Sequence, residues 1–473
     1  MPRQTYDFVI AANRLPVDRV VHDDGTEEWQ TSPGGLVTAM ESVMRGRSAA
    51  WVGWAGIPDE TPEPFTDDEL LLVPVPLSLD EVTSYYEGYS NDSLWPIYHD
   101  VIVPATFRRS WAAAYEQVNE RFAQECAKVA AEGATVWVHD YQLQLVPAML
   151  RELRPDVRIG WFNHIPFPPV ELFGQLPMRR EILSGLLGAD FLGFQRPADA
   201  ENFLRACRRI LGARTKGEVV DVPHSDRRVR AASVPISIDA GGLRELAMSD
   251  AVQERAREIR EQLGNPRTVL LGVDRLDYTK GIRHRLKAFE ELLRDGRLSP
   301  DDVCLVQVAS PSRERVEAYR ELREQVERTV GSINGAYSPI GHTAVTYLHR
   351  SFPREEMAAL YVAADVMLVT PLRDGMNLVA KEYVTCHDGP GALVLSEFTG
   401  AAGQLRQAFM CNPHDIGGLK QAIMDAIETP EKERAKRMRA LRNQVAKNDV
   451  QHWAETYLAA LRAAPEKPAS SES

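Results

Sequence analysis

Short runs of β-branched and other apolar residues alternate along most of this chain with longer segments of amphipathic helical periodicity. Such alternation is typical of parallel β-sheets whose faces are covered by helices. Strands are predicted at residues 6–12, 135–139, 157–163 and 191–195 in the first half, and at 268–273, 303–309, 344–349, 366–370 and 392–396 in the second. The sequence therefore predicts an α/β protein.

The length of 473 residues is enough for two or three domains. A helix is predicted over residues 312–333, where apolar residues recur every three or four positions against an Arg- and Glu-rich face. One run of strands ends at residues 234–239 and a charged helix follows, so we place a domain boundary near residue 240. We expect domains at 1–240 and 241–449, and a flexible polar tail at 466–473.

The chain has 55 Lys and Arg residues and 67 Asp and Glu residues, a net charge of −12. A nucleic-acid partner is not expected, because binding phosphate backbones needs a basic face. The longest apolar stretch, residues 70–79, contains two prolines and is much shorter than the roughly 20 residues that span a bilayer. With no membrane segment, no signal-peptide pattern and five scattered cysteines, we expect a cytoplasmic protein without disulfides or a structural metal.

Several common ligand-binding motifs are absent from the sequence. It contains no Gly-x-Gly-x-x-Gly after a strand, no Gly-x4-Gly-Lys-Ser/Thr and no Asp-x-Asp pair. Residues 23–26, Asp-Asp-Gly-Thr, lack the nucleophilic Asp of an aspartyl-phosphatase motif and are predicted to form a hairpin turn. Dinucleotide, P-loop and simple divalent-metal sites are therefore not supported.

Two cations, Arg275 and Lys280, follow the strand predicted at 268–273. Arg offers a bidentate fork and Lys a point charge, so together they can bracket a diphosphate at the end of a strand. The alternative is that they form surface salt bridges with Asp274 and Asp277, which are common and weak.

A second motif, residues 370–382, follows the strand predicted at 366–370. Asp374 and Asn377 can cap a helix whose free N–H groups form an anion site. Glu382 lies one turn beyond Leu378, where a carboxylate can accept hydrogen bonds from both ribose hydroxyls. The alternative is a capped core helix with a solvated Glu.

In the first half, polar residues also follow predicted strands. Arg14 follows the first strand, and Gly34-Gly35 in residues 32–36 open a helix where backbone amides could approach a phosphate, or form only a tight turn. Residues 139–141, His-Asp-Tyr, and the Pro-bounded His164 end two further strands. A histidine held in a rigid loop at the end of a strand is a candidate for function.

Four motifs together resemble the trehalose-6-phosphate synthases: residues 32–36, 164–168, 275–281 and 374–382. The likeness extends from Arg14 to about residue 460 and is closest to bacterial, especially actinobacterial, members. It implies a GT-B fold, with two Rossmann-like doubly wound domains facing a central cleft. The acceptor side would be the N-terminal domain, rejoined by a last helix at about 450–465, and the donor side the C-terminal domain.

The resemblance also implies a reaction. Glucose would be transferred with retention from a nucleoside-diphosphate glucose to glucose 6-phosphate, giving α,α-trehalose 6-phosphate, without a cofactor or a metal. Arg275 and Lys280 would stabilise the leaving diphosphate in place of a metal ion. No carboxylate is evident as a nucleophile, so front-face attack is the mechanistic hypothesis. The partners would be small molecules, and a separate trehalose-phosphatase would act downstream; the oligomeric state stays open, a homo-oligomer included.

Site residues follow from the same resemblance. The implied acceptor residues are Arg14, Tyr86, Trp95, Asp140 and Arg313, of which the two arginines and Tyr86 would hold the 6-phosphate. The implied donor residues are Gly34, Gly35, Asn163, His164, Arg275, Lys280, Phe352, Asp374, Gly375, Met376, Asn377, Leu378, Val379 and Glu382. The implied catalytic residues are Arg275, Lys280, His164, Asp140 and Trp95.

The roles differ within these sets. Trp95 would wall the acceptor sugar and Asp140 would bind its hydroxyls. His164 would bond the transferred glucose near its 6-hydroxyl, Asp374 would grip the same sugar, and Glu382 would take the ribose. The residues lining the nucleotide would be Phe352, Leu378 and Val379.

Asn163 departs from the pattern of bacterial relatives, which commonly have an apolar residue there. An amide can pair with the edge of guanine, so Asn163 favours GDP-glucose over the family's usual UDP-glucose, unless the amide is satisfied by backbone. Two other functions stay open: a pseudo-glycosyltransferase that couples cyclitols, and a non-catalytic sugar-phosphate sensor. The presence of Tyr86, Trp95 and Arg313 disfavours the cyclitol-coupling enzyme, and the intact donor motifs disfavour the sensor.

Overall fold

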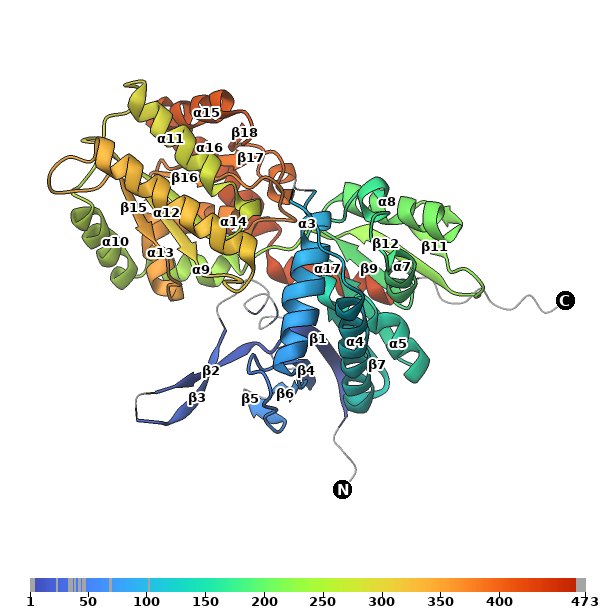
Figure 1. Cartoon of the computed structure of the whole chain (residues 1–473). Coiled ribbons are helices and arrows are strands. Elements are labelled where there is room, and N and C mark those ends of the chain that lie inside the picture. Colours follow the sequence, from blue (N-terminus) through green and yellow to red (C-terminus); the bar gives the residue numbers. More distant parts are fainter. Residues whose placement is uncertain are drawn as a thin grey trace. The chain divides into compact units, whose positions relative to one another are not determined.

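The structure is a computed structural model that describes residues 5–22, 24–32, 37, 40, 44, 48–67, 70–100 and 103–464. The chain divides into two compact units. The first consists of Met1–Ile236 and Trp453–Ser473, and the second of Ser237–His452. Each unit has its own large β-sheet, and the two are described separately (Figure 1).

The first unit is built on a ten-stranded sheet in the order β10-β11-β12-β9-β8-β7-β1-β4-β6-β5. The strands from β12 to β6 are parallel, and antiparallel strands lie at both edges. The chain begins in the middle at β1, moves outward through β4 and β6, and then returns past β1 to β7. The bounds are β1 Tyr6–Arg14, β4 Ala49–Trp54, β5 Phe65–Asp67, β6 Leu70–Pro74, β7 Ala130–His139, β8 Arg158–Phe162, β9 Phe191–Phe194, β10 Thr215–Lys216, β11 Val219–Asp221 and β12 Arg228–Ser233.

Helices connect these strands, and an unusually long π-helix precedes α3. The bounds are α2 Leu79–Glu81, η1 (the π-helix) Val82–Leu94, α3 Trp95–Tyr98, α4 Arg109–Val129, η2 Tyr141–Leu143, α5 Val146–Leu153, α6 Val170–Phe173, α7 Arg179–Leu186, α8 Pro197–Ala206 and η3 Cys207–Leu211. The chain returns to this unit within α17, Val450–Arg462. There Tyr457 stacks on Trp137 with ring centroids 4.2 Å apart, and Trp453 donates to the Val234 carbonyl.

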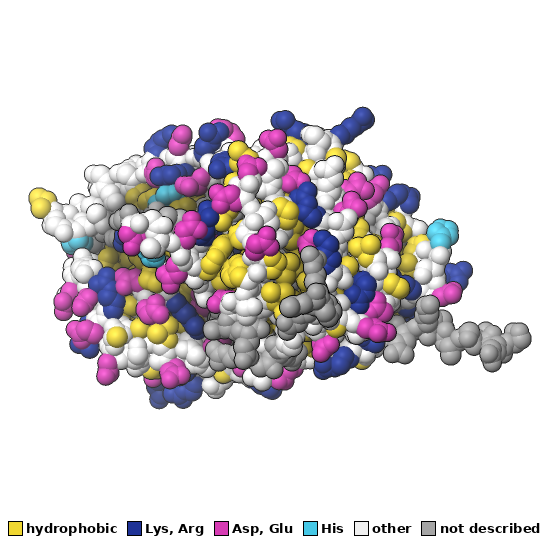
Figure 2. All heavy atoms as spheres, turned by 90° about the horizontal axis from the view of Figure 1, so that it is seen from below, with side chains coloured by type: hydrophobic (Ala, Val, Ile, Leu, Met, Phe, Trp, Pro, Cys, Tyr) yellow, Lys and Arg dark blue, Asp and Glu magenta, His cyan; other side chains and the backbone are white. Residues whose placement is uncertain are grey.

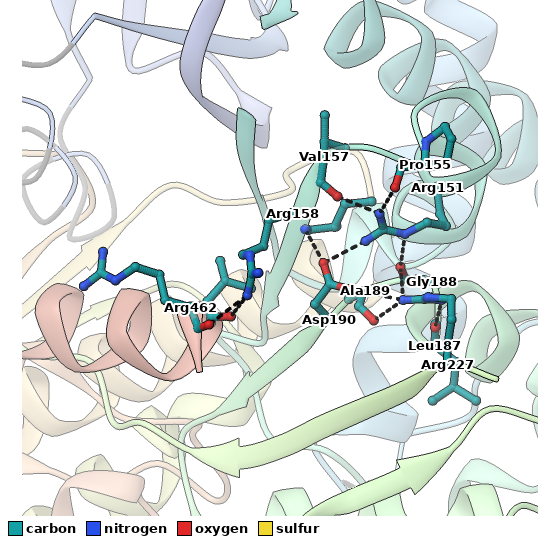
Figure 3. A network of polar contacts seen from close by, with 12 residues as sticks. Arg151, Pro155, Val157, Arg158, Leu187, Gly188, Ala189, Asp190, Arg227 and Arg462 are labelled. Atoms are coloured by element: carbon teal, nitrogen blue, oxygen red, sulfur yellow. Dashed lines mark hydrogen bonds and ion pairs between the residues drawn. The ribbon is translucent and has the colours of Figure 1, made fainter. Parts of the chain in front are cut away.

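A network of arginines fixes the amino-terminal edge of this sheet (Figure 3). The Asp190 carboxylate accepts from Arg151 at 2.7 Å and from the Ile159 backbone N–H at 2.8 Å. Arg227 donates to the carbonyls of the three residues that follow α7, and Arg158 donates to the last carbonyls of α17. These guanidiniums satisfy helix carboxyl ends, so this edge has a structural role.

The second unit has a six-stranded, fully parallel sheet in the order β15-β14-β13-β16-β17-β18. Here too the chain starts in the middle, at β13, moves outward to β15, and returns past β13 to β16. The strands are β13 Thr268–Arg275, β14 Val303–Ser310, β15 Val345–Leu348, β16 Val366–Val369, β17 Ala392–Ser396 and β18 Phe409–Cys411. The helices are α9 Ala240–Met248, α10 Asp250–Gln262, η4 Tyr278–Lys280, α11 Ile282–Arg294, α12 Glu317–Tyr337, α13 Arg354–Ala363, α14 Leu378–Cys386, η5 Gly400–Gly403, α15 Ile416–Glu428 and α16 Glu431–Lys447.

Every predicted strand is confirmed, with ends that differ by a few residues. The largest differences are at β7, which begins earlier than predicted, and at β1 and β13, which contain Arg14 and Arg275 instead of ending before them. The predicted helix 312–333 is wrong at its start, because Arg313 has a φ of +50° and α12 begins only at Glu317. The strands β4, β6 and β12 were not predicted.

The predicted turn at residues 23–26 lies in a hairpin formed by β2, Val17–Val21, and β3, Glu27–Thr31. Gly25 has a φ of +82°, a value that favours glycine. Asp23 lies outside the described residues. The hairpin interpretation is confirmed for the part of the turn that the structure describes.

Figure 2 shows one face of the molecule, on which basic and acidic side chains are interspersed. In the part of the chain that the structure describes, no helix is both long enough and apolar enough to cross a membrane.

Candidate functional site

The predicted polar residues lie where each sheet changes direction. In open parallel sheets, ligands bind at the carboxyl ends of the strands between which the chain reverses, here β1 and β7 in the first unit and β13 and β16 in the second. Arg14 ends β1 and Asp140 directly follows β7, whereas Arg275 ends β13 and Asp374 lies beyond β16. The residues that the motifs single out therefore belong to two reversal points, one in each unit.

Arg14 is held by its neighbours in the first unit. Its guanidinium bonds the Asp18 carboxylate and lies over the Trp54 ring, 5.1 Å from the centroid. Gly56 has a φ of +86°, and a Cβ there would lie 2.3 Å from the Arg14 Nη2 atom. The glycine thus leaves room for a guanidinium whose side chain is 43% exposed and accessible to an anion.

Asp140 has a strained backbone at the end of β7. Its φ of 73° is uncommon for a residue other than glycine, and such strain often occurs at functional sites. The carboxylate accepts from the His164 backbone N–H at 3.1 Å, and the Asp140 carbonyl accepts from the Trp161 indole at 3.1 Å. The loops after β7 and β8 are therefore joined by Asp140.

His164 contacts a second histidine. The His164 Nε2 and His139 Nδ1 atoms are 3.0 Å apart. His139 is completely buried at the last position of β7, whereas His164 is partly exposed. Burial lowers the pKa of His164 to about 3, and burial together with His164 lowers the pKa of His139 well below its ordinary value. Both rings are neutral at pH 7.

Two of the residues predicted for the acceptor, Tyr86 and Trp95, lie in or directly after the π-helix η1. Tyr86 lies within η1 and is partly exposed, and Trp95 begins α3. Trp95 is buried, and its ring centroid lies 3.9 Å from that of His99. The Tyr85 hydroxyl donates to Asn13 Oδ1 at 2.8 Å, which ties η1 to the end of β1. π-Helices are rare and often found at functional sites.

The Asn163 side chain is fully buried. Its Nδ2 donates to the Ile165 carbonyl at 2.7 Å, whereas its Oδ1 is buried without a hydrogen-bond partner among the described residues. Its backbone N–H donates to the Gly193 carbonyl at 2.9 Å. The structure gives Asn163 a role in shaping the loop after β8, so the argument from this residue for guanine recognition loses its basis.

Gly34 and Gly35 lie outside the described residues. Phe352 lies in the segment between β15 and α13, and the Arg350 guanidinium covers its ring at 4.7 Å. Leu378 and Val379 form the first turn of α14 and are partly exposed, whereas Gly375 and Met376 are buried just before it.

In the second unit, three cations gather around one buried carboxylate. Asp277 is completely buried and accepts from the Tyr319 hydroxyl at 3.0 Å and from Arg313 at 3.4 Å. Burial would raise the pKa of Asp277, but Arg313, Arg275 and Lys280 lower it to about 2. This carboxylate therefore stays ionised and partly neutralises a cluster of three positive charges at the ends of β13 and β14.

Lys280 also pairs with the second donor motif. Its Nζ donates to Asp374 Oδ2 at 2.6 Å, and Asn377 Nδ2 donates to the same oxygen at 3.1 Å. Gly281, with a φ of +66°, brings this loop against the end of β16, where a Cβ would lie 2.0 Å from the Thr370 carbonyl oxygen. The Lys280 side chain thus bonds Asp374 of the other motif, and not Asp274 or Asp277, the surface partners considered from the sequence.

The capping prediction is half right. Asn377 is the N-cap of α14, and its Oδ1 accepts from the Ala380 N–H at 3.1 Å. Asp374 does not cap the helix, because its carboxylate is held by Lys280 and Asn377. The free N–H groups at the start of α14 are therefore placed beside the Lys280–Asp374 pair.

Glu382 has a partner that the sequence could not indicate. The Tyr361 hydroxyl, on α13, donates to Glu382 Oε2 at 2.7 Å. Burial raises the pKa of Glu382, and the Tyr361 hydroxyl and nearby Arg354 oppose this rise. The carboxylate is thus held in one orientation and is not a solvated surface group.

Within the described residues, no three His, Cys, Asp or Glu side chains gather in a way that could hold a metal ion. Positive charge at the reversal point of the second unit comes from side chains: Arg275 is exposed, Lys280 is partly exposed and Arg313 is nearly buried. The arrangement can bind an anionic group such as a diphosphate or a phosphate.

Comparison with known proteins assigns this chain to a family. The model of "Glycosyltransferase family 20" matches residues 6–463. The chain belongs to glycosyltransferase family 20. It is therefore an enzyme of the glycosyltransferase class, and the resemblance found in its motifs is confirmed.

A relative and two solved structures illustrate the match. The trehalose-6-phosphate synthase of Mycolicibacterium gilvum is 57% identical over 100% of this chain and 96% of its own length. The crystal structure of an alpha,alpha-trehalose-phosphate synthase (UDP-forming) from Burkholderia vietnamiensis is 33% identical, covers 98% of both chains and has a TM-score of 0.89. A UDP-forming synthase from Burkholderia xenovorans in complex with glucose-6-phosphate is 32% identical over 96% of this chain and 99% of its own, with a TM-score of 0.88. The predicted GT-B fold class is confirmed.

Proposed function

We propose that this family 20 enzyme is a trehalose-6-phosphate synthase that transfers glucose, with retention, from UDP-glucose to glucose 6-phosphate. The observation that carries the proposal is the group of Arg275, Lys280 and Arg313 around Asp277. A protein of net charge −12 concentrates basic residues there, as two phosphate-bearing substrates require. The relatives named above carry this activity in their names.

In the proposed reaction the first unit mainly binds the acceptor and the second unit mainly binds the donor. In the first unit, Arg14 and Tyr86 bind the phosphate of the acceptor, while Asp140 and Trp95 contact its sugar. In the second unit, Arg275 and Lys280 bind the diphosphate of the donor. The other donor contacts of this unit are assigned to Asp374, the start of α14, Phe352 and Glu382. Two residues contribute to the other substrate: His164 of the first unit to the transferred glucose, and Arg313 of the second unit to the acceptor phosphate.

The chemical step follows from the state of the carboxylates. Asp374 accepts from Lys280 and Asn377, and Asp140 accepts from the His164 backbone N–H, so both carboxylates have a positioning role and neither is assigned as a nucleophile. The acceptor hydroxyl attacks C1 on the face from which the diphosphate leaves. The C1–O bond to the phosphate breaks with its electron pair on the phosphate oxygen, which takes the hydroxyl proton. Arg275 and Lys280 stabilise the negative charge that develops there, and no metal ion is required.

The purified protein with glucose 6-phosphate and UDP-glucose is expected to form trehalose 6-phosphate and UDP in equal amounts. GDP-glucose should give a lower kcat/KM, because Asn163, the only residue that favoured guanine, is buried and bonded to Ile165. Product is measured by anion-exchange chromatography and its anomeric configuration by proton NMR, with and without a chelator. Absence of product with either donor would contradict the proposal and favour a cyclitol-coupling enzyme or a sensor.

Asn163→Leu provides the matched control for donor preference. The variant lacks the amide that could pair with guanine, so the ratio of kcat/KM between UDP-glucose and GDP-glucose should stay as in the unmodified enzyme. A fall in use of GDP-glucose alone would restore Asn163 as the residue that reads the base.

Tyr361→Phe is expected to weaken binding of the nucleotide sugar. The change removes the hydrogen bond to Glu382 and leaves a partly buried carboxylate without that donor. A hydrogen bond to a charged group contributes about 1.5–3 kcal/mol, so KM for UDP-glucose should rise by roughly tenfold or more. KM for glucose 6-phosphate should change little. Tyr347→Phe is the control, since its buried hydroxyl has no hydrogen-bond partner among the described residues; equal effects of the two variants would contradict the assignment.

A further inference from the structure

His139 and His164 share one proton across their contact, and the surroundings of the two rings decide which ring holds it. Both imidazoles are neutral, so each carries a single N–H. The 3.0 Å contact joins His139 Nδ1 to His164 Nε2 and needs one proton between them. Two arrangements are available, and they differ in the tautomer of both rings.

In the first arrangement, His164 donates from Nε2, and His139 must then carry its own proton on Nε2. That atom is buried and has no hydrogen-bond partner among the described residues. Its surroundings are aromatic: the Trp137 ring centroid lies 4.8 Å from that of His139, and the Phe162 centroid lies 6.5 Å away. A buried N–H without an acceptor is rare in proteins and costly.

In the second arrangement, His139 donates from Nδ1 and its Nε2 is unprotonated. The buried His139 Nε2 is then an acceptor that lacks a donor, and neither ring has a buried N–H that lacks an acceptor. His164 carries its proton on Nδ1, and this ring belongs to a partly exposed residue, so water or a ligand can accept from it. The second arrangement satisfies every N–H of the pair.

We propose that His139 is a positioning residue that fixes His164 as the Nδ1–H tautomer, so that His164 presents a hydrogen-bond donor to a hydroxyl oxygen of the bound sugar. His139 does so from the last position of β7, one residue before Asp140. Asp140 holds the His164 backbone N–H at 3.1 Å, so the end of β7 fixes both the backbone and the ring of His164. The sugar contact rests on the proposed function, whereas the tautomer does not.

This assignment limits what His164 can do. Its Nε2 lone pair is occupied by the His139 N–H, and its Nδ1 carries a proton. A neutral imidazole in this state donates but has no free lone pair with which to accept a proton from the acceptor hydroxyl. His164 therefore orients the substrate and does not act as a general base, in agreement with transfer of the proton to the departing phosphate.

The tautomer is tested first in the unmodified protein, by the nitrogen chemical shifts of ¹⁵N-labelled histidine assigned with His139→Phe and His164→Ala. We expect His164 to show a protonated Nδ1 and an unprotonated Nε2, and His139 to show the same pattern. A protonated His164 Nε2 would overturn the inference whatever reaction the enzyme catalyses. Failure of the proposed function alone would leave these shifts unchanged.

The role in the reaction is tested by a double-mutant cycle. His139→Phe retains an aromatic ring but removes the donor, and should lower kcat/KM by about threefold to tenfold, as expected for one neutral hydrogen bond. If His139 acts through His164, adding His139→Phe to His164→Ala should cause no further loss. His139→Asn, whose Nδ2 can donate from a similar position, should recover activity relative to Phe. Additive losses in the double variant, or equal activity of Asn and Phe, would overturn the positioning role.

Discussion

Arg275→Ala is expected to reduce kcat by about 100-fold or more, the largest effect that we predict on activity. Arg275 is exposed at the end of β13 and close enough to Asp277 to lower its pKa. In the proposed reaction its fork stabilises charge that develops on the leaving phosphate, and loss of one such donor typically costs about 10²–10³ in kcat. The KM for glucose 6-phosphate should change much less than kcat.

The matched control is Arg267→Ala. Arg267 is also exposed, but it precedes Thr268 at the amino end of the same strand, on the opposite edge of the sheet from Arg275. Arg275→Lys should recover part of the activity, since a point charge replaces the fork. Near-normal turnover of Arg275→Ala, or an equal loss in Arg267→Ala, would remove Arg275 from the mechanism.

The strands and their polar ends could be predicted because both signals are local. A buried parallel strand is a continuous apolar run, and the residue that follows it lies at the carboxyl edge of the sheet. Arg275 and His164 were found in this way before any fold was known, and their positions at strand ends are confirmed. The strand β6 was missed, although residues 70–79 are the longest apolar stretch, because prolines interrupt that pattern.

The partners of the site residues could not be predicted, because they lie far away in sequence. Tyr361 and Glu382 are 21 residues apart, and Lys280 and Asp374 are 94 apart. No periodicity relates such positions until the helices pack. Asp277 was predicted in part. Its motif was recognised, but the residue was considered only as a surface partner of the cations. In the structure Asp277 is completely buried.

Backbone strain is a further property that periodicity does not report. Asp140, Arg313 and Asn377 all have φ values between 50° and 76°, and all three were proposed as site residues without any sign of this strain in the sequence. For Arg313 the strain explains the error in the predicted helix, since a left-handed residue cannot continue a right-handed helix. The same conformation turns the guanidinium onto Asp277 and Tyr319. The helix prediction thus fails at Arg313, which is also a candidate binding residue.

Arg285→Met is expected to cause the largest loss of stability, about 3–5 kcal/mol in the free energy of unfolding of the second unit. The Arg285 side chain is completely buried and bonds Asp274 at 2.7 Å and Gln307 at 2.7 Å. Gly272 leaves the space, since a Cβ there would lie 2.2 Å from Arg285 Nη1. Removal of the guanidinium leaves Asp274 buried without its cation, one residue before Arg275.

The distribution of tryptophan makes this loss measurable in one unit. All eight tryptophans lie in the first unit, so their fluorescence follows that unit, whereas far-UV circular dichroism follows both. Arg285→Met should lower the dichroism midpoint by roughly 6–20 °C, with a smaller shift in fluorescence. Arg283→Met, an exposed arginine on the same helix, should change neither. Asp274→Asn combined with Arg285→Met should recover part of the loss, because the buried charge is removed. If the double variant were no more stable than Arg285→Met, the loss would come from side-chain packing and not from an unpaired buried carboxylate.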